Sequence, residues 1–569
     1  MIKIPNIFKK DALSVHHAAI YIAFFALISG ILGLLRDRLL AGIFGASRTL
    51  DIYYASFRIP DFIYTLMLFL ASSTAIIPLL LRKLEQNPKE AERFLGNILV
   101  FFILVILAVS CLIFFFMSSI TQLLFPGFSA SDVGLVTLLS RIMLLSPIFL
   151  GISNILSGTV QSTKKFFASA LSPVFYNCGI IFGILFFLPF FGIAGLAIGV
   201  ALGAFLHMGI LLPSFFSLDF VPTPKFLMRG FVSKFNSFLL SDVKKVIFIS
   251  MPRALGLAAN QFLIMFATSI ASVLSGGSIA IFNLAQNLES IPITVLGLSY
   301  SIAAFPLLSS FSIKKDKDHF FEYFSAAFRH IIFWTVPFSA LLLILRAQIV
   351  RVILGSGAFS WQDTRLTAAS LFLLSLSVVF QSLFLLLTRS FYAEEETRRP
   401  LLVNITSAIF GILAVFGFLK ILSPGHPFAS FTSFVLDISD IYDIRVLALS
   451  FGILISSIFN FVLLFFYFKS VFGYFPSGKA DPSVLQIFLS SLVGASVAYL
   501  GLNVFSLVFD LQTFSGIFLQ GLFSGILGIC AIFAVLYAFK NKEFFEILSG
   551  LKTAMWKDRV ALPEPEKLL

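Results

Sequence analysis

The feature that most constrains this chain is a series of fourteen apolar segments, nearly all of about twenty residues or more. A helix of about twenty apolar residues crosses the ~30 Å hydrocarbon core of a bilayer, whereas strands of membrane barrels alternate over about ten residues. The chain is 59% hydrophobic and 12% charged and contains 73 phenylalanines, which suits lipid as its solvent. We therefore expect an all-α polytopic membrane protein with about fourteen transmembrane helices.

The predicted spans are the apolar runs between charged residues or clusters of Pro, Gly and Asn. They are residues 15–44, 52–81, 94–119, 133–160, 168–189, 193–216, 246–274, 279–309, 328–345, 366–392, 401–422, 446–468, 484–509 and 515–539. The first run resembles a signal peptide, but it is too long and lacks a small-residue cleavage site, so we expect it to be retained.

Basic residues indicate the orientation of these spans. Most of the 40 Lys and Arg residues lie at the two ends and in alternate loops, and such loops face the cytoplasm. Both termini are therefore expected to be cytoplasmic. The basic residues are spread between spans rather than gathered on one face, so the net charge of +12 does not indicate a nucleic-acid partner.

The chain contains two copies of one plan, displaced by about 230 residues. The matching elements are AIIPLL at 75–80 with AAFPLL at 303–308, the FSxxD motif at 128–132 with that at 359–363, and Asn177 with Asn404. Each copy has six spans, so we expect two six-helix bundles in a parallel pseudo-twofold repeat plus two C-terminal helices. The predicted parts are an N-lobe (1–216), a cytoplasmic linker (217–245), a C-lobe (246–468), two appended helices (469–545) and a cytoplasmic tail (546–569).

Charged residues inside the first span are candidates for function. Arg36, Asp37 and Arg38 lie between apolar stretches, where an Arg costs about 2.5–3.5 kcal/mol to insert. Such a residue is kept where it faces a partner or a wet cavity, so the group predicts an anion-binding wall. A short outer loop, or a simple pair between Arg36 and Asp37, is the alternative.

Four further polar residues lie within predicted spans. Arg58 precedes Asp61 and either binds substrate, snorkels or pairs with that carboxylate. Arg253 follows Pro252 and has the same two interpretations, substrate binding or snorkelling. Asn287 and Glu289 lie deep in the eighth span, where a carboxylate needs a partner or a proton.

No sequence motif for catalysis is present. The chain lacks a nucleophile elbow, a Walker motif and a zincin helix. The three cysteines lie inside apolar runs without metal-site spacing, and we expect them to be buried packing residues without a metal. Duplication, charged residues within spans and the absence of catalytic motifs favour a secondary transporter that is not an enzyme and needs no cofactor.

The segment from Ser29 to Leu80 resembles the MurJ (MviN) lipid II flippases of the multidrug, oligosaccharidyl-lipid and polysaccharide exporter superfamily. Its core is G-x-x-RD-x-x-x-A-x-x-FG-x-x-x-x-x-D, from Gly33 to Asp51. The resemblance continues through FPGF at 125–128, PRALGLAANQ at 252–261, the GS and IPxxVLG elements at 277–297, and RSFYAEEETRRP at 389–400.

The resemblance implies a bacterial plasma-membrane protein whose two bundles alternate around a cationic cavity for a polyprenyl pyrophosphate, with the last two helices holding its tail. It places Ser29, Arg36 and Asp37 in the cavity and suggests a gate at Asp51, to which we add Arg38. The substrate-binding set is then completed by Arg58, Arg253, Asn287 and Glu289. Many family members have arginines where this chain has Gly30, Tyr64 and Asn287, and the acidic-glycine pair of the family is replaced by Phe69 and Leu70.

The expected function is translocation of lipid II from the inner to the outer leaflet during peptidoglycan synthesis, by a protein that acts as a monomer among membrane lipids. Coupling to the membrane potential or a monovalent ion is left open. One alternative is a flippase for another polyprenyl-linked glycan. A cation-coupled drug exporter is another, but its cavity should be neutral or acidic, which Arg36 argues against. A membrane-embedded transferase would need a carboxylate or His at an interface, and Glu289 lies too deep.

Overall fold

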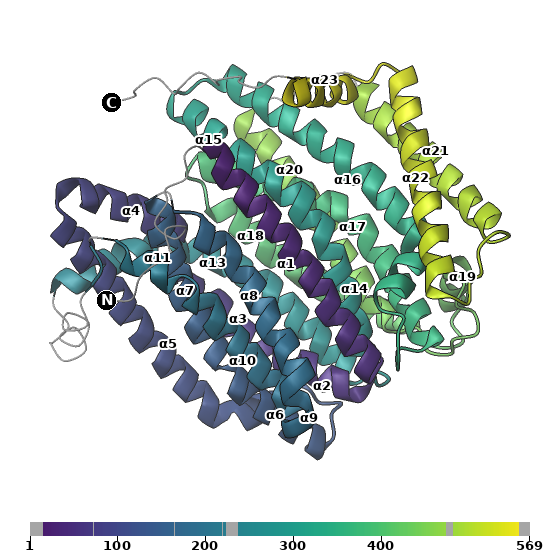
Figure 1. Cartoon of the computed structure of the whole chain (residues 1–569), viewed down its shortest axis with the longest axis horizontal. Helices are drawn as coiled ribbons and strands as arrows, with labels where there is room; N and C mark the ends of the chain where they lie inside the picture. The colour runs from purple at the N-terminus through teal and green to yellow at the C-terminus, as the bar shows by residue number, and fades with distance from the viewer. Residues whose placement is uncertain are drawn as a thin grey trace. The chain divides into compact units, whose positions relative to one another are not determined.

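The computed structural model describes residues 15–71, 73–163, 165–218, 220–222, 237–473 and 482–556. These residues form helices, and no strand occurs among them (Figure 1). Twelve of the helical segments are long and apolar enough to cross a membrane, and they match the third to fourteenth predicted spans one by one. The prediction of an all-α polytopic membrane protein is confirmed.

The chain divides into two compact units, which are described separately. The first comprises Met1–Leu288, Ile353–Ser370 and Thr397–Asn460, and the second comprises Glu289–Val352, Leu371–Glu396 and Phe461–Leu569. This division follows packing rather than sequence duplication. The predicted N-lobe and C-lobe, and the pseudo-twofold relation between them, stay predictions.

Helices of the first unit fall into two groups along the chain. The first group is α1 (Val15–Phe44), α2 (Arg48–Ser56), α3 (Arg58–Ala71), α4 (Ser73–Gln86), α5 (Pro88–Leu124), α6 (Ala130–Met143), α7 (Leu145–Ser162), α8 (Phe167–Phe182), the π-helix η2 (Gly183–Phe187), α9 (Leu188–Phe191), α10 (Ala194–Gly209) and α11 (Leu212–Phe216). The second group is α13 (Ser237–Ser272), the start of α14 (Ser278–Pro292), α18 (Arg398–Ile421), α19 (Pro427–Leu436) and the start of α20 (Leu447–Phe472).

The second unit contains the π-helix η3 (Ile293–Leu298), α15 (Ser299–Ile313), most of α16 (Lys317–Ile353) and most of α17 (Trp361–Ala393). It also contains the C-terminal helices α21 (Pro482–Phe505), α22 (Phe514–Ala538) and α23 (Lys542–Trp556).

The helix α1 has the predicted bounds 15–44, but the second span is divided among α2, α3 and α4. Pro60 lies in the first turn of α3, where its missing N–H costs nothing. The helix α13 begins at Ser237, inside the predicted linker, and residues 223–236 of that linker lie outside the described residues.

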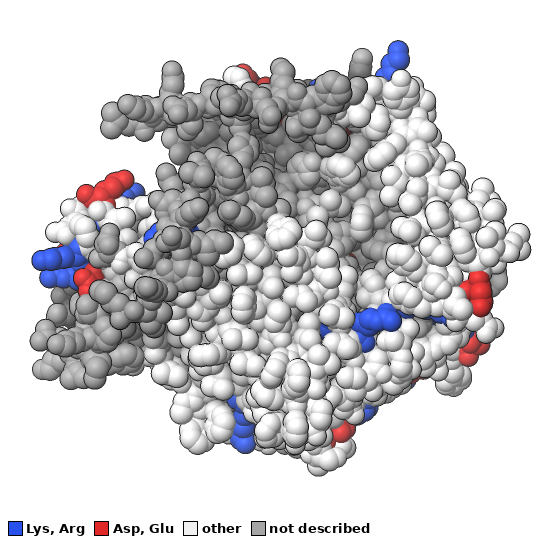
Figure 2. Space-filling model, viewed as in Figure 1, with Lys and Arg blue, Asp and Glu red and all other residues white. Residues whose placement is uncertain are grey.

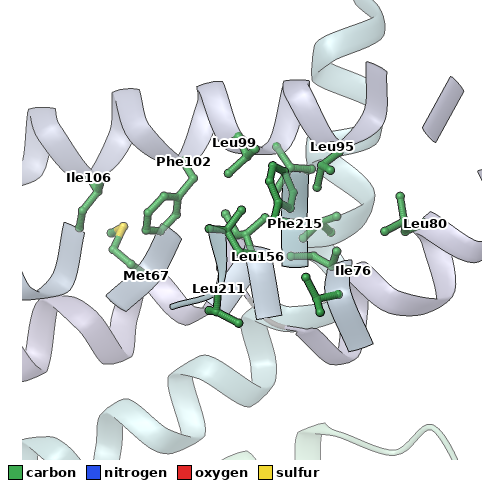
Figure 3. Packing of buried hydrophobic residues seen from close by; sticks show 14 of the residues in the cluster. Met67, Ile76, Leu80, Leu95, Leu99, Phe102, Ile106, Leu156, Leu211 and Phe215 are labelled. Carbon is green, nitrogen blue, oxygen red and sulfur yellow. The ribbon is translucent and has the colours of Figure 1, made fainter. Parts of the chain in front are cut away.

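Two kinds of packing hold the first unit together. A buried apolar cluster joins α3, α4, α5 and α7, with Met67, Leu80 and Phe102 among its members (Figure 3). Elsewhere, glycines allow α8, with its π-helical continuation, to approach α10 closely. A Cβ on Gly183 would lie 2.5 Å from the Cα of Gly199, so side chains larger than hydrogen do not fit there.

The two C-terminal spans form a hairpin in the second unit. The helices α21 and α22 lie side by side, and a Cβ on Gly494 would meet Ile532 at 2.2 Å (Figure 1). Polar contacts attach the end of this hairpin to α16, because Arg329 Nε donates to Glu543 Oε1 at 2.8 Å and Ser483 Oγ donates to the other carboxylate oxygen. The appended helices are therefore joined to α16 by a partly buried ion pair.

The FSxxD motif forms the same local structure at both of its occurrences. The hydroxyl of Ser129 accepts from Asp132 N at 3.2 Å at the start of α6, and that of Ser360 accepts from Asp363 N at 3.1 Å at the start of α17. In both cases the Asp carboxylate accepts from the N–H of the Ser. This reciprocal pattern is a capping box, so the duplicated sequence has a duplicated physical role.

Most of the described surface in view is uncharged (Figure 2). Many large apolar side chains are exposed on the long helices, as a lipid solvent requires. Cys111, Cys178 and Cys530 are exposed, so the expectation that they are buried is wrong. A position within an apolar run indicates that the side chain is shielded from water, but lipid provides this shielding as well as a protein core does. Such a position therefore does not show that a cysteine is packed inside the protein.

Candidate functional site

Arg36 and Asp37 lie in the second half of α1 and pair with each other. Arg36 Nη2 lies 2.8 Å from Asp37 Oδ1, and Arg36 Nε donates to the same oxygen at 2.9 Å. Asp37 is 2% exposed. A paired carboxylate and guanidinium are tolerated at membrane depth where a single charge is not. The pair that the sequence left as an alternative is therefore present.

Two asparagines extend this pair into a network. On α8, Asn177 Oδ1 accepts from Arg36 Nη1 at 3.4 Å, and its Nδ2 donates to Ser29 Oγ at 3.1 Å. On α14, Asn287 Nδ2 donates to Asp37 Oδ2 at 2.9 Å. Four of the predicted site residues are thus brought together by α1, α8 and α14, within the first unit.

Arg58 is a buried cation in the first turn of α3. Its Nη2 donates to Asn283 Oδ1 on α14, and the Asn283 amide is held by its own Nδ2–H bond to Ile279 O at 2.8 Å. Asp61 lies one turn along α3 but is not within ion-pair distance of Arg58 among the described residues. Of the interpretations left open by the sequence, the local pair with Asp61 is therefore not formed.

Asp51 caps the beginning of α14. Its Oδ2 accepts from Gly277 N at 2.7 Å and its Oδ1 accepts from Ala280 N at 2.8 Å. Arg48 Nη1 lies 3.9 Å from the same carboxylate and donates to Ser272 O at 3.3 Å. A carboxylate at a helix N-terminus satisfies amides that have no partner within the helix. Asp51 is fully buried and joins segments 226 residues apart.

A second set of contacts lies at the same end of α1. Arg38 Nη1 donates to Ile353 O at 3.3 Å, and Ala358 N donates to Gly42 O at 2.8 Å. Ala46 N donates to Asp363 Oδ2 at 3.3 Å, so the capping carboxylate of α17 also holds this segment. The two predicted gate residues, Arg38 in α1 and Asp51 in α2, therefore both join the first part of the chain to distant segments of the sequence.

Glu289 belongs to the second unit. Its Oε1 accepts from Gln381 Nε2 at 2.7 Å and from the hydroxyl of Ser377, both on α17. Gln381 Nε2 also donates to Ser377 Oγ at 2.9 Å. The partner that the sequence required for this buried carboxylate is a pair of neutral donors.

Three further positions that the sequence singled out lie in α13, α1 and α3. Arg253 lies in α13, but its side chain is outside the described part of the chain. A Cβ on Gly30 would meet no atom within 4 Å. Tyr64 Oη accepts from Asn154 Nδ2 at 2.8 Å. Of the three positions where the family often has arginine, Tyr64 and Asn287 therefore make hydrogen bonds and Gly30 is open.

Sequence reasoning missed the connecting role of Asn177 and Asn283. It used Asn177 only as a repeat marker and did not single out Asn283. The available signal was an Asn within an apolar run. For Asn283 there was a second signal, because it lies four residues before Asn287 and so on the same face of the helix. Among the described residues, no group of three or more His, Cys, Asp or Glu side chains is placed to hold a metal.

Comparison with known proteins identifies the family. The model of the family described as "Lipid II flippase MurJ" matches residues 40–519, which is more than half of the chain. A protein of Buchnera aphidicola subsp. Acyrthosiphon pisum named "Probable lipid II flippase MurJ" is 31% identical over 399 residues, covering 69% of this chain and 76% of that protein.

Solved structures share the fold. One described as "Lipid II flippase MurJ, inward closed conformation" has a TM-score of 0.68 at 24% identity, covering 91% of this chain and 98% of that one. An inward-facing multidrug resistance MATE family transporter of the MOP superfamily has a TM-score of 0.62 at 15% identity, covering 79% and 96%. The resemblance seen in the sequence is confirmed, and this multi-pass membrane protein belongs to the lipid II flippase MurJ family.

Proposed function

We propose that this chain moves lipid II, the undecaprenyl-pyrophosphate that carries the peptidoglycan disaccharide-peptide, from the inner to the outer leaflet by alternating access and without catalysing a reaction. The family match over residues 40–519 carries this proposal. The charges on α1 and α3, together with their asparagine partners on α14, support it, because polar groups at membrane depth mark the path of a polar substrate.

The contacts of Asp51 and Arg38 suggest how access changes. They join residues 38–51 to the start of α14 and to residues 353–363. These segments lie at the ends of predicted spans and in the loops that the sequence predicts to face outward. Opening toward that side requires these bonds to break, so we propose that this end of the first unit is closed in the observed conformation and opens to release substrate.

The remaining parts of the proposal concern setting and partners. The protein acts as a monomer in the bacterial plasma membrane with both termini in the cytoplasm. The exposed apolar faces of α21 and α22 hold the polyprenyl tail, since they include Phe488, Leu492, Leu500 and Phe518. Transport is coupled to the membrane potential or to a monovalent ion, and Glu289, a buried carboxylate of the second unit, is the group on which such an ion acts.

Rescue of a bacterial strain depleted of its own lipid II flippase tests the function. We expect this chain to restore growth, and an Arg36→Ala variant to insert normally but not to restore it. Failure of a correctly inserted parent chain would refute the proposal. A flipping assay in proteoliposomes with lipid II and with another polyprenyl-linked glycan then distinguishes the two flippase functions.

A further inference from the structure

The C-terminal hairpin of α21 and α22 is attached to α16 by a polar contact near each end of α16. At the end predicted to be cytoplasmic, Arg329 of α16 donates to Glu543 in the first turn of α23. Toward the other end, Gln348 Nε2 of α16 donates to Gln520 Oε1 of α22 at 3.3 Å. Arg329 and Gln348 are 19 residues apart, or about 28 Å along a helix. The two contacts therefore lie at opposite ends of the ninth predicted span.

Between these contacts, glycines of α22 face α16. Gly521, Gly525 and Gly528 are spaced by four and three residues and so lie on one face of the helix. A Cβ on Gly525 would lie 3.2 Å from Leu345 Cδ1, and one on Gly528 would lie 2.7 Å from Leu341 Cδ2. Such a repeat does not fix the axial position by itself, because a slide of one turn, about 5.4 Å, brings another glycine to the same place.

Lipid does not hold the hairpin at one height on α16. Helices in a bilayer are not driven together by the hydrophobic effect, because lipid tails are as apolar as the side chains. The axial position, or register, therefore depends on groups that lipid cannot replace. Buried polar pairs are such groups: they add little stability over apolar pairs, and their best-attested role is to fix register.

The contact at the cytoplasmic end is a network around Glu543, which is 1% exposed. Arg329 Nε donates to Glu543 Oε1 at 2.8 Å, and the hydroxyl of Ser483 on α21 donates to Oε2. Asn541 Nδ2 donates to Ser483 Oγ at 2.8 Å and to Gln486 Oε1 at 3.0 Å. A slide of one turn would separate the carboxylate from the guanidinium, and a buried charge without its partner is costly.

The contact at the other end selects a position more than it adds stability. Gln520 is 5% exposed, and its Nε2 donates to Leu502 O of α21 at 2.9 Å while its Oε1 accepts from Gln348. Gln348 Oε1 is buried and has no hydrogen-bond partner among the described residues. An unsatisfied buried acceptor costs free energy, so an apolar pair at this place would be at least as stable.

We propose that Glu543 and Gln520 are positioning residues, which set the register of the hairpin on α16 and thereby place the polyprenyl tail of the substrate. This inference rests on the proposed function, in which the exposed faces of α21 and α22 hold the tail, and deepens it. A hairpin that slides along α16 carries these faces to a different depth in the bilayer. Transport of a long-tailed lipid therefore needs the observed register, whereas a lipid with a short tail does not.

Disulfide cross-linking in membranes that contain the full-length protein measures the register. The exposed cysteines at positions 111, 178 and 530 are first replaced by Ser. Gln348→Cys with Gly521→Cys reports the observed register, because these Cβ positions lie 3.1 Å apart, close to the ~3.5–4.5 Å of a disulfide. Gln348→Cys with Gly525→Cys reports a slide of one turn. We expect Glu543→Gln to raise this second cross-link about tenfold, the size of one hydrogen bond to a charged group.

Glu546→Gln is the matched control on the same helix. The side chain of Glu546 is half-exposed, and it lies 3.5 Å from His330 Nε2 and 3.8 Å from Lys542 Nζ. Exposed pairs contribute little, so this variant should leave both cross-links within about twofold of the parent. If Glu543→Gln does not insert into the membrane, Arg329→Lys replaces it, because it keeps the charge and removes the Nε donor.

Transport in proteoliposomes tests the link to the tail. The probes are lipid II with its undecaprenyl tail and the same headgroup on a farnesyl tail. Glu543→Gln should lower transport of the long-tailed lipid about tenfold and leave transport of the farnesyl lipid within about twofold of the parent. In the same variant, oxidation of the cysteine pair at positions 348 and 521 locks the observed register. Oxidation should therefore restore transport of the long-tailed lipid, and reduction should remove the recovery.

Three results would overturn the inference: an unchanged slide cross-link in Glu543→Gln, an equal loss of transport for both tail lengths, or no recovery on oxidation. Failure of the parent chain to transport lipid II would refute the proposed function instead. The cross-linking measurement needs no substrate, so the two failures are distinguishable.

Discussion

Removal of the Asp51 carboxylate should open the outer end of the first unit. The carboxylate accepts from Gly277 N at 2.7 Å and from Ala280 N at 2.8 Å, and it is fully buried. Asp51→Ala removes both bonds and leaves two amides at the start of α14 without a partner. Asp51→Asn keeps one acceptor oxygen, and its NH₂ group faces the other amide.

The size of the effect follows from these two bonds. A hydrogen bond to a charged group contributes about 1.5–3 kcal/mol, and we use the lower value because burying the carboxylate itself costs free energy. Asp51→Ala should therefore destabilise the closed contact by about 3 kcal/mol and Asp51→Asn by about 1.5 kcal/mol. The open population should rise about a hundredfold and about tenfold, respectively.

Thiol labelling measures this population. The reporter is Ser278→Cys, in the first turn of α14, where the native side chain is 2% exposed. The exposed native cysteines at positions 111, 178 and 530 are first replaced by Ser, because they would also react. A membrane-impermeant maleimide added to intact cells should then label the reporter faster in Asp51→Asn and faster still in Asp51→Ala.

Asp132→Ala is the matched control. Among the described residues, Asp132 bonds to Ser129 alone, in an exposed capping box of α6. Its carboxylate therefore supports a local helix end and does not join distant segments. Labelling in this variant should equal that of the parent. Equal labelling in Asp51→Ala and the parent would refute the gating role. Equal acceleration of labelling in Asp51→Ala and Asp132→Ala would show that the loss of any helix cap is enough to expose the reporter.

Three further results are expected. Arg36→Lys keeps the charge but loses the planar fork, so lipid II transport in proteoliposomes should fall while membrane insertion is unchanged; full transport would contradict the anion-site prediction. Gly199→Leu places a side chain against the Gly183 backbone, so the yield of folded protein should collapse, whereas a normal yield would disprove close helix packing. The hydrogen bond from Arg365 lowers the pKa of Asp440, so its stabilisation is present above about pH 4 and disappears in acid. The unfolding temperature of Asp440→Asn should be lower than that of the parent at pH 7 and should approach it as the pH falls, and a constant difference would argue against this pair.

The sequence by itself determined the membrane class and most of the spans. A span is recognised from the hydrophobicity of about twenty consecutive residues, which is a local property, so twelve helices match the predicted segments. The FSxxD motif is also local, since its Ser and Asp cap one helix start, and it has the same structure at Asp132 and Asp363. The core from Gly33 to Asp51, together with further motifs along the chain, indicated the family, and the match over residues 40–519 confirms it.

Only the tertiary structure decided which groups are partners. The Asp51 carboxylate meets amides 226 and 229 residues away, and Arg58 meets an asparagine 225 residues away. The sequence showed that these charges need partners, because a buried charge alone is costly, but hydropathy and spacing do not say which distant helix supplies them. The exposure of the cysteines was likewise decided by packing, because apolar side chains face lipid and protein core with similar free energy.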